Sequence, residues 1–377
     1  MAPPSDIQEL IRENHLPPRI LLGPGPSLCD PRVLQAMAAP LLGHLDPAYL
    51  RLMDHIQELL RYVFRTQNRL TLPISGTGSA AMEAAIANLV EPGDAVLVCV
   101  NGYFSQRQAE MARRYGGQVR EIYRSWGEIF TLEDVTRALD EGPAKIVCLV
   151  QAETSTGVLQ PVAEIAKLVH RQGGLLIVDA VTSLGGIPLE VDEWELDIVY
   201  SCSQKCLGCP PGLGPITFGP RAEAVLHNRR TKVANWYLDM ALLEKYWGPE
   251  RVYHHTAPIT MNYALLEGLR IVAEEGIQNR WERHRRNAQL FWDGLSDLGL
   301  VCHAPLEYRL PSLTTVRVPE GVDEAAVRRH LLDTYHIEIG GGLGELKGKV
   351  WRVGLMGYSS QPENVILLLE ALRREIG

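Results

Sequence analysis

The chain has 377 residues, two to three times the length of a usual domain, so we expect two domains, each with its own core. Its 46% of hydrophobic and 22% of charged residues are ordinary for a globular protein and exclude a disordered chain. The 37 basic and 45 acidic side chains leave a net charge of −8, which argues against nucleic acid as a main partner.

The first 22 residues contain four prolines and are predicted to form an extended arm rather than part of a core. From Leu70 onward, short runs of β-branched residues alternate with helical stretches, which is typical of a parallel sheet with crossover helices. A capping box, Thr131 with Asp134, begins one of these helices. The predicted strands are 70–74, 95–100, 119–123, 145–151, 175–179, 196–201 and 213–218, and the predicted helices are 79–90 and 105–115, with one each after Thr131 and Pro161.

The rest of the chain has a different character, with two long helices that lead into a compact α+β region. The predicted elements are helices 263–275 and 278–298, strand 313–318, helix 323–334, strands 337–339 and 349–355, and helix 361–376. We therefore predict a large α/β domain over 23–277, built on a mostly parallel sheet of six or seven strands. A smaller α+β domain is predicted over 278–377.

Ligands of open α/β sheets bind beyond the carboxyl ends of the strands, and the first such end holds the segment Ser75–Ala81. Its glycines let backbone amides approach an anion, and the helix that follows adds a favourable dipole. The segment also fits the dinucleotide pattern G-x-G-x-x-A, but the next strand ends in Cys99–Gly102 without the acid which that pattern requires. We therefore predict a phosphate site here, with a plain helix-start turn as the alternative.

Two further strand ends carry charged residues. Asp179 ends a buried strand, so its carboxylate either caps the next turn or meets a cationic atom of a ligand. Lys205 follows another strand and is flanked by small residues and by Pro210–Gly212, which indicates a fixed, partly buried amine rather than a solvated charge. Burial lowers the pKa of a lysine and frees its lone pair for attack on a carbonyl.

The segment around Lys205 also admits metal chemistry. Cys202, Cys206 and Cys209 have the C-x3-C-x2-C spacing of radical S-adenosylmethionine enzymes, which bind an iron–sulfur cluster. Against that alternative, Gly208 stands where this motif has an aromatic residue. The neighbours His254 and His255 suggest a second metal site, but on an extended strand they would point to opposite faces, so no metal site is predicted.

Taken together, the three strand ends fit one ligand with an anionic tail, a ring that becomes cationic and a carbonyl that condenses with an amine. Pyridoxal 5'-phosphate has all three features. We therefore predict this cofactor, with Lys205 as its amine and Asp179 beside its ring.

The chain also resembles the alanine–glyoxylate/serine–pyruvate aminotransferases. These are class V aminotransferases of fold type I among pyridoxal-phosphate enzymes, and the resemblance implies a seven-stranded sheet of the aspartate aminotransferase type. The matching motifs run in the family's order from about residue 20 to the C-terminus. They are Gly23-Pro24-Gly25-Pro26-Ser27, Gly43-His44-Leu45-Asp46-Pro47, Ser75-Gly76-Thr77-Gly78, Glu91-Pro92-Gly93-Asp94, Glu153-Thr154-Ser155-Thr156-Gly157, Val178-Asp179-Ala180-Val181, Ser203-Gln204-Lys205 with Pro210-Pro211-Gly212, and Tyr253-His254-His255-Thr256.

The resemblance implies two catalytic residues. Lys205 would form a Schiff base with the cofactor and, once the substrate displaces it, move the proton between the substrate Cα and the cofactor C4′. Asp179 would keep the ring nitrogen protonated, so that the ring accepts electrons.

The remaining site residues follow from the same resemblance. The phosphate would be bound by Thr77, Gly78, Ser79 and Gln204. Tyr253 and Thr256 would reach the phosphate in the other subunit, so the site would depend on a homodimer.

Around the ring, Phe104 would stack on one face, Val181 would pack on the other, and Thr154 would lie near the phenolic oxygen. Arg352 would bind the substrate α-carboxylate with its planar fork, and Gly25 would lie close to the substrate and keep the pocket small.

Phe104 marks a departure, because animal members carry tryptophan there and cysteine desulfurases of the same class carry histidine. Desulfurases also need a reactive cysteine in the small domain, and residues 305–377 contain none, so aminotransfer is favoured. We expect alanine or serine as amino donor and glyoxylate as acceptor, with a ureidoglycine–glyoxylate aminotransferase as the alternative. The seven scattered cysteines and the lack of a basic leader or long apolar run predict a cytoplasmic enzyme that binds no membrane.

Overall fold

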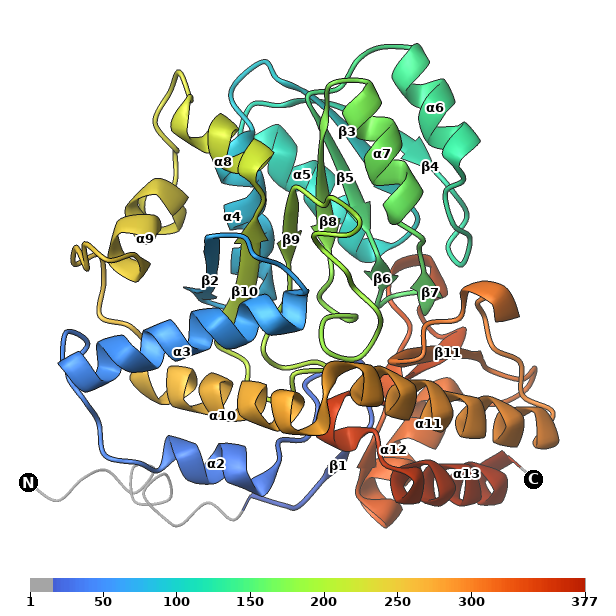
Figure 1. Cartoon of the computed structure of the whole chain (residues 1–377). Coiled ribbons are helices and arrows are strands. Elements are labelled where there is room, and N and C mark those ends of the chain that lie inside the picture. Colours follow the sequence, from blue (N-terminus) through green and yellow to red (C-terminus); the bar gives the residue numbers. More distant parts are fainter. Residues whose placement is uncertain (1–15, 377) are drawn as a thin grey trace, which may run out of the picture.

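The computed structural model describes residues 16–376, which form a large sheet wrapped by helices and a second group of elements near the C-terminus (Figure 1). The strands are β1 Ile20–Leu21, β2 Leu70–Ser75, β3 Ala95–Val100, β4 Gln118–Tyr123, β5 Ile146–Val150, β6 Ala152–Glu153, β7 Val158–Leu159, β8 Leu175–Asp179, β9 Ile198–Tyr200, β10 Leu213–Phe218, β11 Leu313–Arg317, β12 Ile337–Glu338, β13 Gly340–Gly341 and β14 Val350–Gly354. The α-helices are α2 Pro31–Met37, α3 Pro47–Phe64, α4 Gly78–Leu89, α5 Tyr103–Arg114, α6 Leu132–Asp140, α7 Ala163–Arg171, α8 Pro220–His227, α9 Met240–Trp247, α10 Ile259–Glu275, α11 Ile277–Asp297, α12 Glu324–Tyr335 and α13 Pro362–Ile376.

The large sheet has seven strands in the order β2-β10-β9-β8-β5-β3-β4. Only β10 runs antiparallel to its neighbours, β2 and β9, and the other adjacent pairs are parallel. The predicted fold class, a mostly parallel seven-stranded sheet with a smaller C-terminal part, is therefore confirmed. Because β2 and β9 both oppose β10, the carboxyl ends of β2, β3, β5, β8 and β9 all reach the same edge of the sheet.

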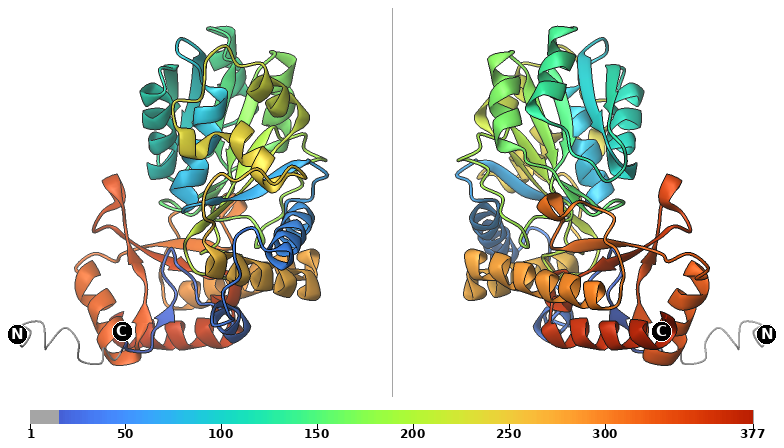
Figure 2. Two further views of the ribbon diagram at one scale, coloured as in Figure 1. Left: turned by 90° about the vertical axis from the view of Figure 1, so that its left-hand side faces the viewer. Right: turned by 90° about the vertical axis from the view of Figure 1, so that its right-hand side faces the viewer.

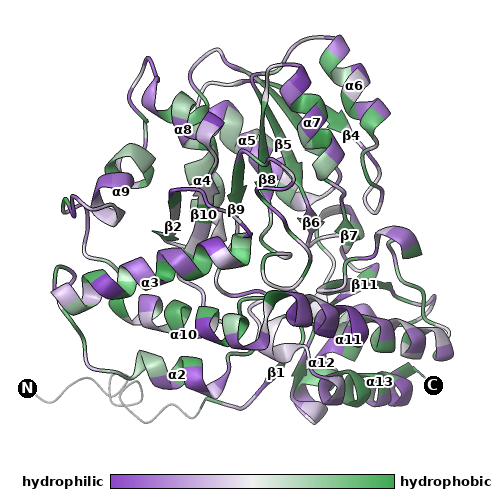
Figure 3. Ribbon diagram, viewed as in Figure 1, coloured by the Kyte–Doolittle hydropathy of each residue, from purple (hydrophilic) through white to green (hydrophobic). Residues whose placement is uncertain are grey.

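Two main clusters of buried apolar side chains divide the chain. The first spans Val33 to Ile277 and includes the central strands of the large sheet, among which β3, β5 and β8 are almost entirely apolar (Figure 3). The second is built mainly from residues between Phe291 and Leu372. In the side views of Figure 2, the orange and red C-terminal elements lie below those that surround the large sheet. The exact boundary between 277 and 278 stays a prediction, because α10 and α11 meet at Gly276 with little interruption.

The prediction that residues 1–22 lie outside any core is wrong for their last part. β1 pairs in parallel with β12, with Ile20 opposite Ile337, and Leu22 is fully buried in the second cluster. The apolar run that follows Pro17 and Pro18 supplies an edge strand, which explains this outcome. Residues 1–15, which belong to the same prediction, lie outside the described residues.

Local sequence signals explain where the helices begin. Thr131 and Asp134 form the predicted capping box at the start of α6, with hydrogen bonds in both directions. The sequence analysis missed α3, which begins at Pro47 after Asp46, whose carboxylate accepts a hydrogen bond from the Ala48 amide at 2.7 Å. No helix within residues 16–376 is long and apolar enough to cross a membrane.

Candidate active site

The predicted site residues of the large domain follow the strands that end at one edge of the sheet. They are Thr77, Gly78 and Ser79 after β2, Phe104 after β3, Thr154 after β5, Asp179 and Val181 at the end of β8, and Gln204 and Lys205 after β9. This shared edge follows from the strand order, because parallel strands present their carboxyl ends together. The sequence signals at three separate strand ends therefore belong to one region of the molecule.

Lys205 lies in the loop after β9 and is half-buried. Its Nζ donates a hydrogen bond to the carbonyl oxygen of Pro24, on the segment that precedes α2. Burial lowers the pKa of Lys205 from its ordinary value, and the nearby guanidinium of Arg352 lowers it further. The amine is thus set up to lose its proton more readily than a surface lysine.

Gly25 lies directly against this amine. A Cβ at Gly25 would stand 2.5 Å from the Lys205 Nζ, and the backbone φ of +115° is one that side-chain-bearing residues rarely adopt. The close approach of the 23–26 segment to Lys205 therefore requires glycine at this position. The structure places Gly25 next to Lys205, and its closeness to the substrate stays a prediction.

Asp179 is the last residue of β8 and is 2% exposed. Its Oδ2 accepts a hydrogen bond from the Tyr200 hydroxyl at 2.8 Å, and its Oδ1 accepts one from the Val181 amide at 2.8 Å. Burial raises the pKa of Asp179 to about 7, although these two hydrogen bonds and the charge of Lys205 act in the opposite direction. A buried carboxylate with this pKa is stabilised strongly by any cation placed beside it.

The start of α4 forms a cup for an anion. Thr77 precedes the helix, and its side chain makes no capping hydrogen bond. The first amides of a helix have no intrahelical partner, so those of Gly78 and Ser79 are free to bind an anion. Gly78 allows a close approach, since a Cβ there would lie 2.9 Å from the Cβ of Cys202. The buried Oε1 of Gln204 has no hydrogen-bond partner among the described residues.

Phe104 and Val181 are both half-buried, and a Cβ added at Gly78 would lie 3.4 Å from Val181 Cγ2. The start of α5, which carries Phe104, rests on Glu153. A Cβ at Gly102 would lie only 2.3 Å from the Glu153 Cδ, so the helix start and the carboxyl group are tightly packed. Burial raises the pKa of Glu153, while the amides of Phe104 and Ser105 lower it. Glu153 thus supports the position of the Phe104 ring.

Arg352, on β14, is 7% exposed and reaches from the C-terminal part to the large sheet. Its Nε donates to the Gly341 carbonyl at 2.7 Å and its Nη1 to the Thr154 carbonyl at 3.3 Å. Burial lowers the pKa of Arg352 to about 10. No ion pair within residues 16–376 involves this guanidinium, so its charge is available to an anionic ligand.

The Thr154 hydroxyl shares a hydrogen bond of 2.5 Å with Thr182.

Tyr253 and Thr256 make no side-chain hydrogen bond to the other predicted site residues, although their neighbour His255 contacts Ser75 at the end of β2. Both are exposed, and the Tyr253 ring packs on His44 with ring centroids 5.2 Å apart. The resemblance assigned these two residues to the site of a second subunit, and their exposure is compatible with that assignment.

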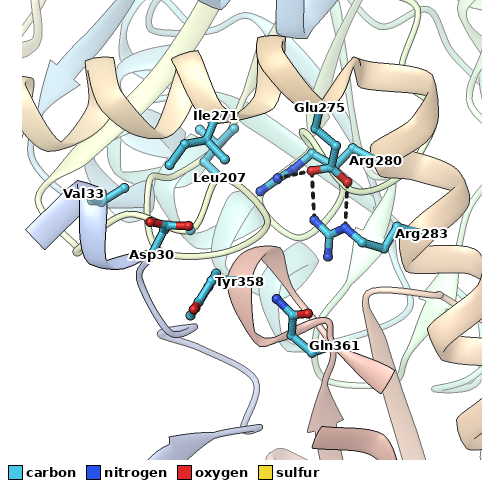
Figure 4. A pocket seen from close by; sticks show the side chains of 10 residues that line it. Asp30, Val33, Leu207, Ile271, Glu275, Arg280, Arg283, Tyr358 and Gln361 are labelled. Carbon is cyan, nitrogen blue, oxygen red and sulfur yellow. Dashed lines mark hydrogen bonds and ion pairs between the residues drawn. The ribbon is translucent and has the colours of Figure 1, made fainter. Parts of the chain in front are cut away.

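The other side of the Lys205 loop borders a cavity of about 190 Å³ (Figure 4). Arg280, which is 3% exposed, donates to the carbonyl of Cys206 and pairs with Glu275, both at 2.7 Å. Arg283 pairs with the same carboxylate at 2.6 Å and donates to the Ser360 carbonyl at 2.6 Å. These contacts join the residue after Lys205 to the start of α11 and to the C-terminal part.

The cysteine alternative does not fit the structure. Cys202 donates to the Val181 carbonyl, Cys206 to that of Thr182 and Cys209 to that of Ala264, so the three thiols are turned to different partners. Burial raises the pKa of all three thiols, which disfavours the thiolate form that a cluster needs. No group of three or more potential metal ligands occurs within residues 16–376.

The expected geometry of the histidine pair is wrong. His254 and His255 do not point apart, because they lie in a loop and their Nδ1 atoms are 2.8 Å from each other. His254 stacks on Trp236 with ring centroids 4.4 Å apart, and the Nε2 of His255 lies 2.6 Å from the Ser75 hydroxyl.

Several supporting residues escaped the sequence analysis. Tyr200 and Gln108 form a chain to Asp179, since Gln108 donates to the Tyr200 hydroxyl at 3.0 Å. Tyr200 is the last residue of β9, which pairs with β8. Its place at a strand end could have indicated its role. Glu153, Arg280 and Gln108 act through contacts between distant segments, which no local pattern indicates.

With this geometry in place, the comparison with known families is direct. The family model "Aminotransferase class-V" matches residues 21–363, and the chain belongs to that family. The chain is therefore an aminotransferase, and the predicted class is confirmed.

Two kinds of relative are similar to the chain over nearly its whole length. The alanine–glyoxylate aminotransferase of Mus musculus is 42% identical, covering 100% of this chain and 91% of the relative. The crystal structure of alanine–glyoxylate aminotransferase from Nostoc sp. matches with a TM-score of 0.97 and 57% identity, covering 99% of both chains. The (S)-ureidoglycine–glyoxylate transaminase of Bacillus subtilis (strain 168) is 39% identical, covering 96% of this chain and 91% of the relative.

Proposed function

We propose that the chain is a pyridoxal 5'-phosphate-dependent aminotransferase that moves the amino group of alanine or serine to glyoxylate. The products are pyruvate or hydroxypyruvate, and glycine. The observation that carries this proposal is the arrangement at the sheet edge, where the Lys205 amine and the buried Asp179 carboxylate lie at the ends of neighbouring strands, next to an anion cup.

The residues at this edge fit the cofactor. The cup of Thr77, Gly78, Ser79 and Gln204 has a free hydroxyl, free backbone amides and a side-chain NH2 group that can donate to a phosphate. Asp179 would face the ring nitrogen, Phe104 and Val181 would enclose the ring, and Thr154 would lie near its phenolic oxygen. Pyridoxal phosphate, when bound, supplies an aldehyde that exchanges amines and a ring that accepts electrons from the substrate Cα.

Lys205 would hold and move the proton at its Nζ. Because burial lowers its pKa, the amine is neutral more often than a surface lysine and accepts a proton from the substrate Cα more readily. The contact with the Pro24 carbonyl orients the amine. Gly25 has no side chain that would collide with it. Asp179, held by Tyr200 and Val181, would keep its negative charge because it faces a cation.

Arg352 would bind the substrate α-carboxylate. Two backbone carbonyls fix the guanidinium, and no acidic side chain of the described chain forms an ion pair with it. The sequence offers no second arginine for a side-chain carboxylate, which favours a small, uncharged donor. The similarity to relatives named alanine–glyoxylate aminotransferase supports this donor class.

The proposal also includes a homodimer in which Tyr253 and Thr256 reach the partner's phosphate. Around the exposed Tyr253, the aromatic residues Trp236 and Tyr237 are also exposed, at 60% and 41%. Large apolar groups of this kind mark association surfaces. Mixing the inactive variants Lys205→Ala and Thr256→Ala should restore part of the activity in hybrid dimers, and strictly monomeric behaviour in light scattering would contradict the dimer.

We place the enzyme in the cytoplasm. All seven cysteines lie within the described residues and none forms a disulfide, which suits a reducing compartment. Fractionation of cells that produce the full chain, with a cytosolic marker enzyme as control, tests this placement.

Separate incubation of the purified enzyme with glyoxylate and each donor tests the reaction. We expect glycine to form with alanine and with serine. Turnover with ureidoglycine but with neither alanine nor serine would replace the proposal by the second candidate, which the Bacillus subtilis relative supports.

Replacing Arg352 by glutamine should lower kcat/KM for alanine about a hundredfold, because a charge-assisted pair with the substrate is lost. The exposed Arg317 on the neighbouring strand β11 is the matched control, and Arg317→Gln should leave kcat/KM unchanged. Equal effects of the two substitutions would remove Arg352 from the substrate site.

A further inference from the structure

Arg107 lies beside the phosphate cup, although no sequence pattern pointed to it. It is a residue of α5, which packs next to α4 (Figure 1). Its Nη1 donates to the Ser79 hydroxyl at 2.9 Å. Its guanidinium carbon lies 5.2 Å from the ring centroid of Phe104 and 5.4 Å from that of Tyr103. Arg107 therefore contacts both a residue of the cup and the ring that would stack on the cofactor.

The charge of Arg107 has no acidic partner within residues 16–376. Two other arginines of the same helix are paired, Arg113 with Glu121 and Arg114 with Glu110. Arg107 instead contacts a hydroxyl group and two aromatic rings. Of these three arginines of α5, the unpaired one is the residue that faces the cup.

The location of this charge is unfavourable unless an anion is bound. Ser79 is the second residue of α4, and the N-terminal end of a helix carries a partial positive charge. A cation beside that end is repelled, whereas an anion between them is attracted by both. The arrangement of Arg107 and α4 therefore resembles a pair of donors that share an anionic ligand.

The other groups of the cup bring no full charge. Thr77, Gly78, Ser79 and Gln204 are all neutral. His255, which contacts Ser75 at the end of β2, is neutral at pH 7 because burial lowers its pKa to about 4. A phosphate monoester carries a charge of about −1.5 to −2 at this pH. Among residues 16–376, Arg107 is the cation whose side chain hydrogen-bonds to a residue of the cup.

We propose that Arg107 is a phosphate-binding residue, which balances the charge of the cofactor phosphate next to Ser79. This inference rests on the proposed function, since it requires a phosphorylated cofactor. Arg107 acts on binding and needs no part in proton transfer.

The test compares two cofactor forms that differ only in the phosphate. Apoenzyme is titrated with pyridoxal phosphate and with pyridoxal, and tryptophan fluorescence reports binding. Arg107→Gln should weaken the binding of pyridoxal phosphate about tenfold to a hundredfold, as expected for a lost charge-assisted hydrogen bond, and leave pyridoxal binding nearly unchanged. Inorganic phosphate should bind the wild-type apoenzyme and compete with pyridoxal phosphate, and Arg107→Gln should weaken this competition.

Arg114→Gln is the matched control, because Arg114 lies on the same helix and its recorded partner is the exposed Glu110. It should leave both affinities unchanged. Arg107→Lys, which keeps the charge, should recover part of the lost affinity. An equal loss for both cofactor forms would show that Arg107 only supports Phe104 and would overturn the proposal. Failure of wild-type apoenzyme to bind pyridoxal phosphate would instead overturn the proposed function itself.

Discussion

The loop that carries Lys205 has two sides, and they differ in how their polar groups are satisfied. On the side of the sheet edge, Gln204 Oε1 lacks a partner within the described chain and Arg352 lacks an acidic one. On the opposite side, shown in Figure 4, Arg280 and Arg283 share the carboxylate of Glu275 and bind backbone carbonyls. On the sheet-edge side a guanidinium without an ion pair is available to a ligand. On the opposite side the arginines are paired with Glu275 and hold the loop in place, although Arg280 Nε has no hydrogen-bond partner among the described residues.

This comparison predicts that substitutions on the two sides have different effects. Changes at the sheet edge should reduce activity without reducing stability. Changes in the Arg280 network should reduce stability first. A variant in each region, measured for both quantities, is therefore more informative than either measurement alone.

The largest expected effect is that of Lys205→Ala. Loss of the amine that moves the proton should reduce kcat at least about a thousandfold, while the melting temperature stays close to that of the wild type. Lys167→Ala is the control, because Lys167 is an exposed residue of α7 paired with Glu164. Retention of more than a tenth of the wild-type kcat in Lys205→Ala would place the chemistry elsewhere.

Asp179 predicts a pH dependence of stability in the apoenzyme. The pKa is about 7 in the folded chain and about 3.9 in an unfolded one, so the folded state holds its proton more tightly. The contribution of Asp179 to the free energy of unfolding is fully present below pH ~4. It is lost as the pH rises through 7, which lowers the free energy of unfolding by up to about 4 kcal/mol.

The Asp179→Asn variant has no carboxyl group that titrates at this position. Its free energy of unfolding in urea, minus that of the wild type, should therefore increase from pH 4 to pH 7. The exposed Asp293→Asn should show no change of this kind. A constant difference over the range would mean that Asp179 is not destabilised by burial.

The smallest of these effects is that of Arg280→Met, at about 3 kcal/mol of unfolding free energy. The substitution removes the buried guanidinium that pairs with Glu275, although Arg283 still binds that carboxylate, and it leaves the Cys206 carbonyl without its charged donor. Urea unfolding measures the loss, and Arg285→Met, on the exposed face of α11, is the control. Unchanged stability together with a large loss of kcat would contradict the assignment of this side to structure.

Much of the fold could be predicted, because the signals of the large sheet are local. Strands 95–100, 175–179 and 213–218 match the structure residue for residue, since continuous apolar runs with clear ends indicate buried strands. The helix α3 was missed although its signals were present. Asp46-Pro47 is a helix start, and Met53, Ile56 and Leu60 repeat at helical spacing.

The site was predictable where a residue ends a strand, as Asp179 does, or lies in the loop after one, as Lys205 does. Tyr200 was available by the same logic and was overlooked. Arg280 and Arg107 could not be predicted, because their partners lie far away in the sequence: Arg280 reaches Cys206 from α11, and Arg107 reaches Ser79 from α5. Their roles depend on how helices pack, which no single segment encodes.

One measurement tests the central claim most directly. The enzyme is incubated with pyridoxal phosphate, reduced with borohydride, digested and mapped by mass spectrometry. We predict a phosphopyridoxyl group on the Nζ of Lys205 and on no other lysine. A label on a different lysine, or no label at all, would contradict the account.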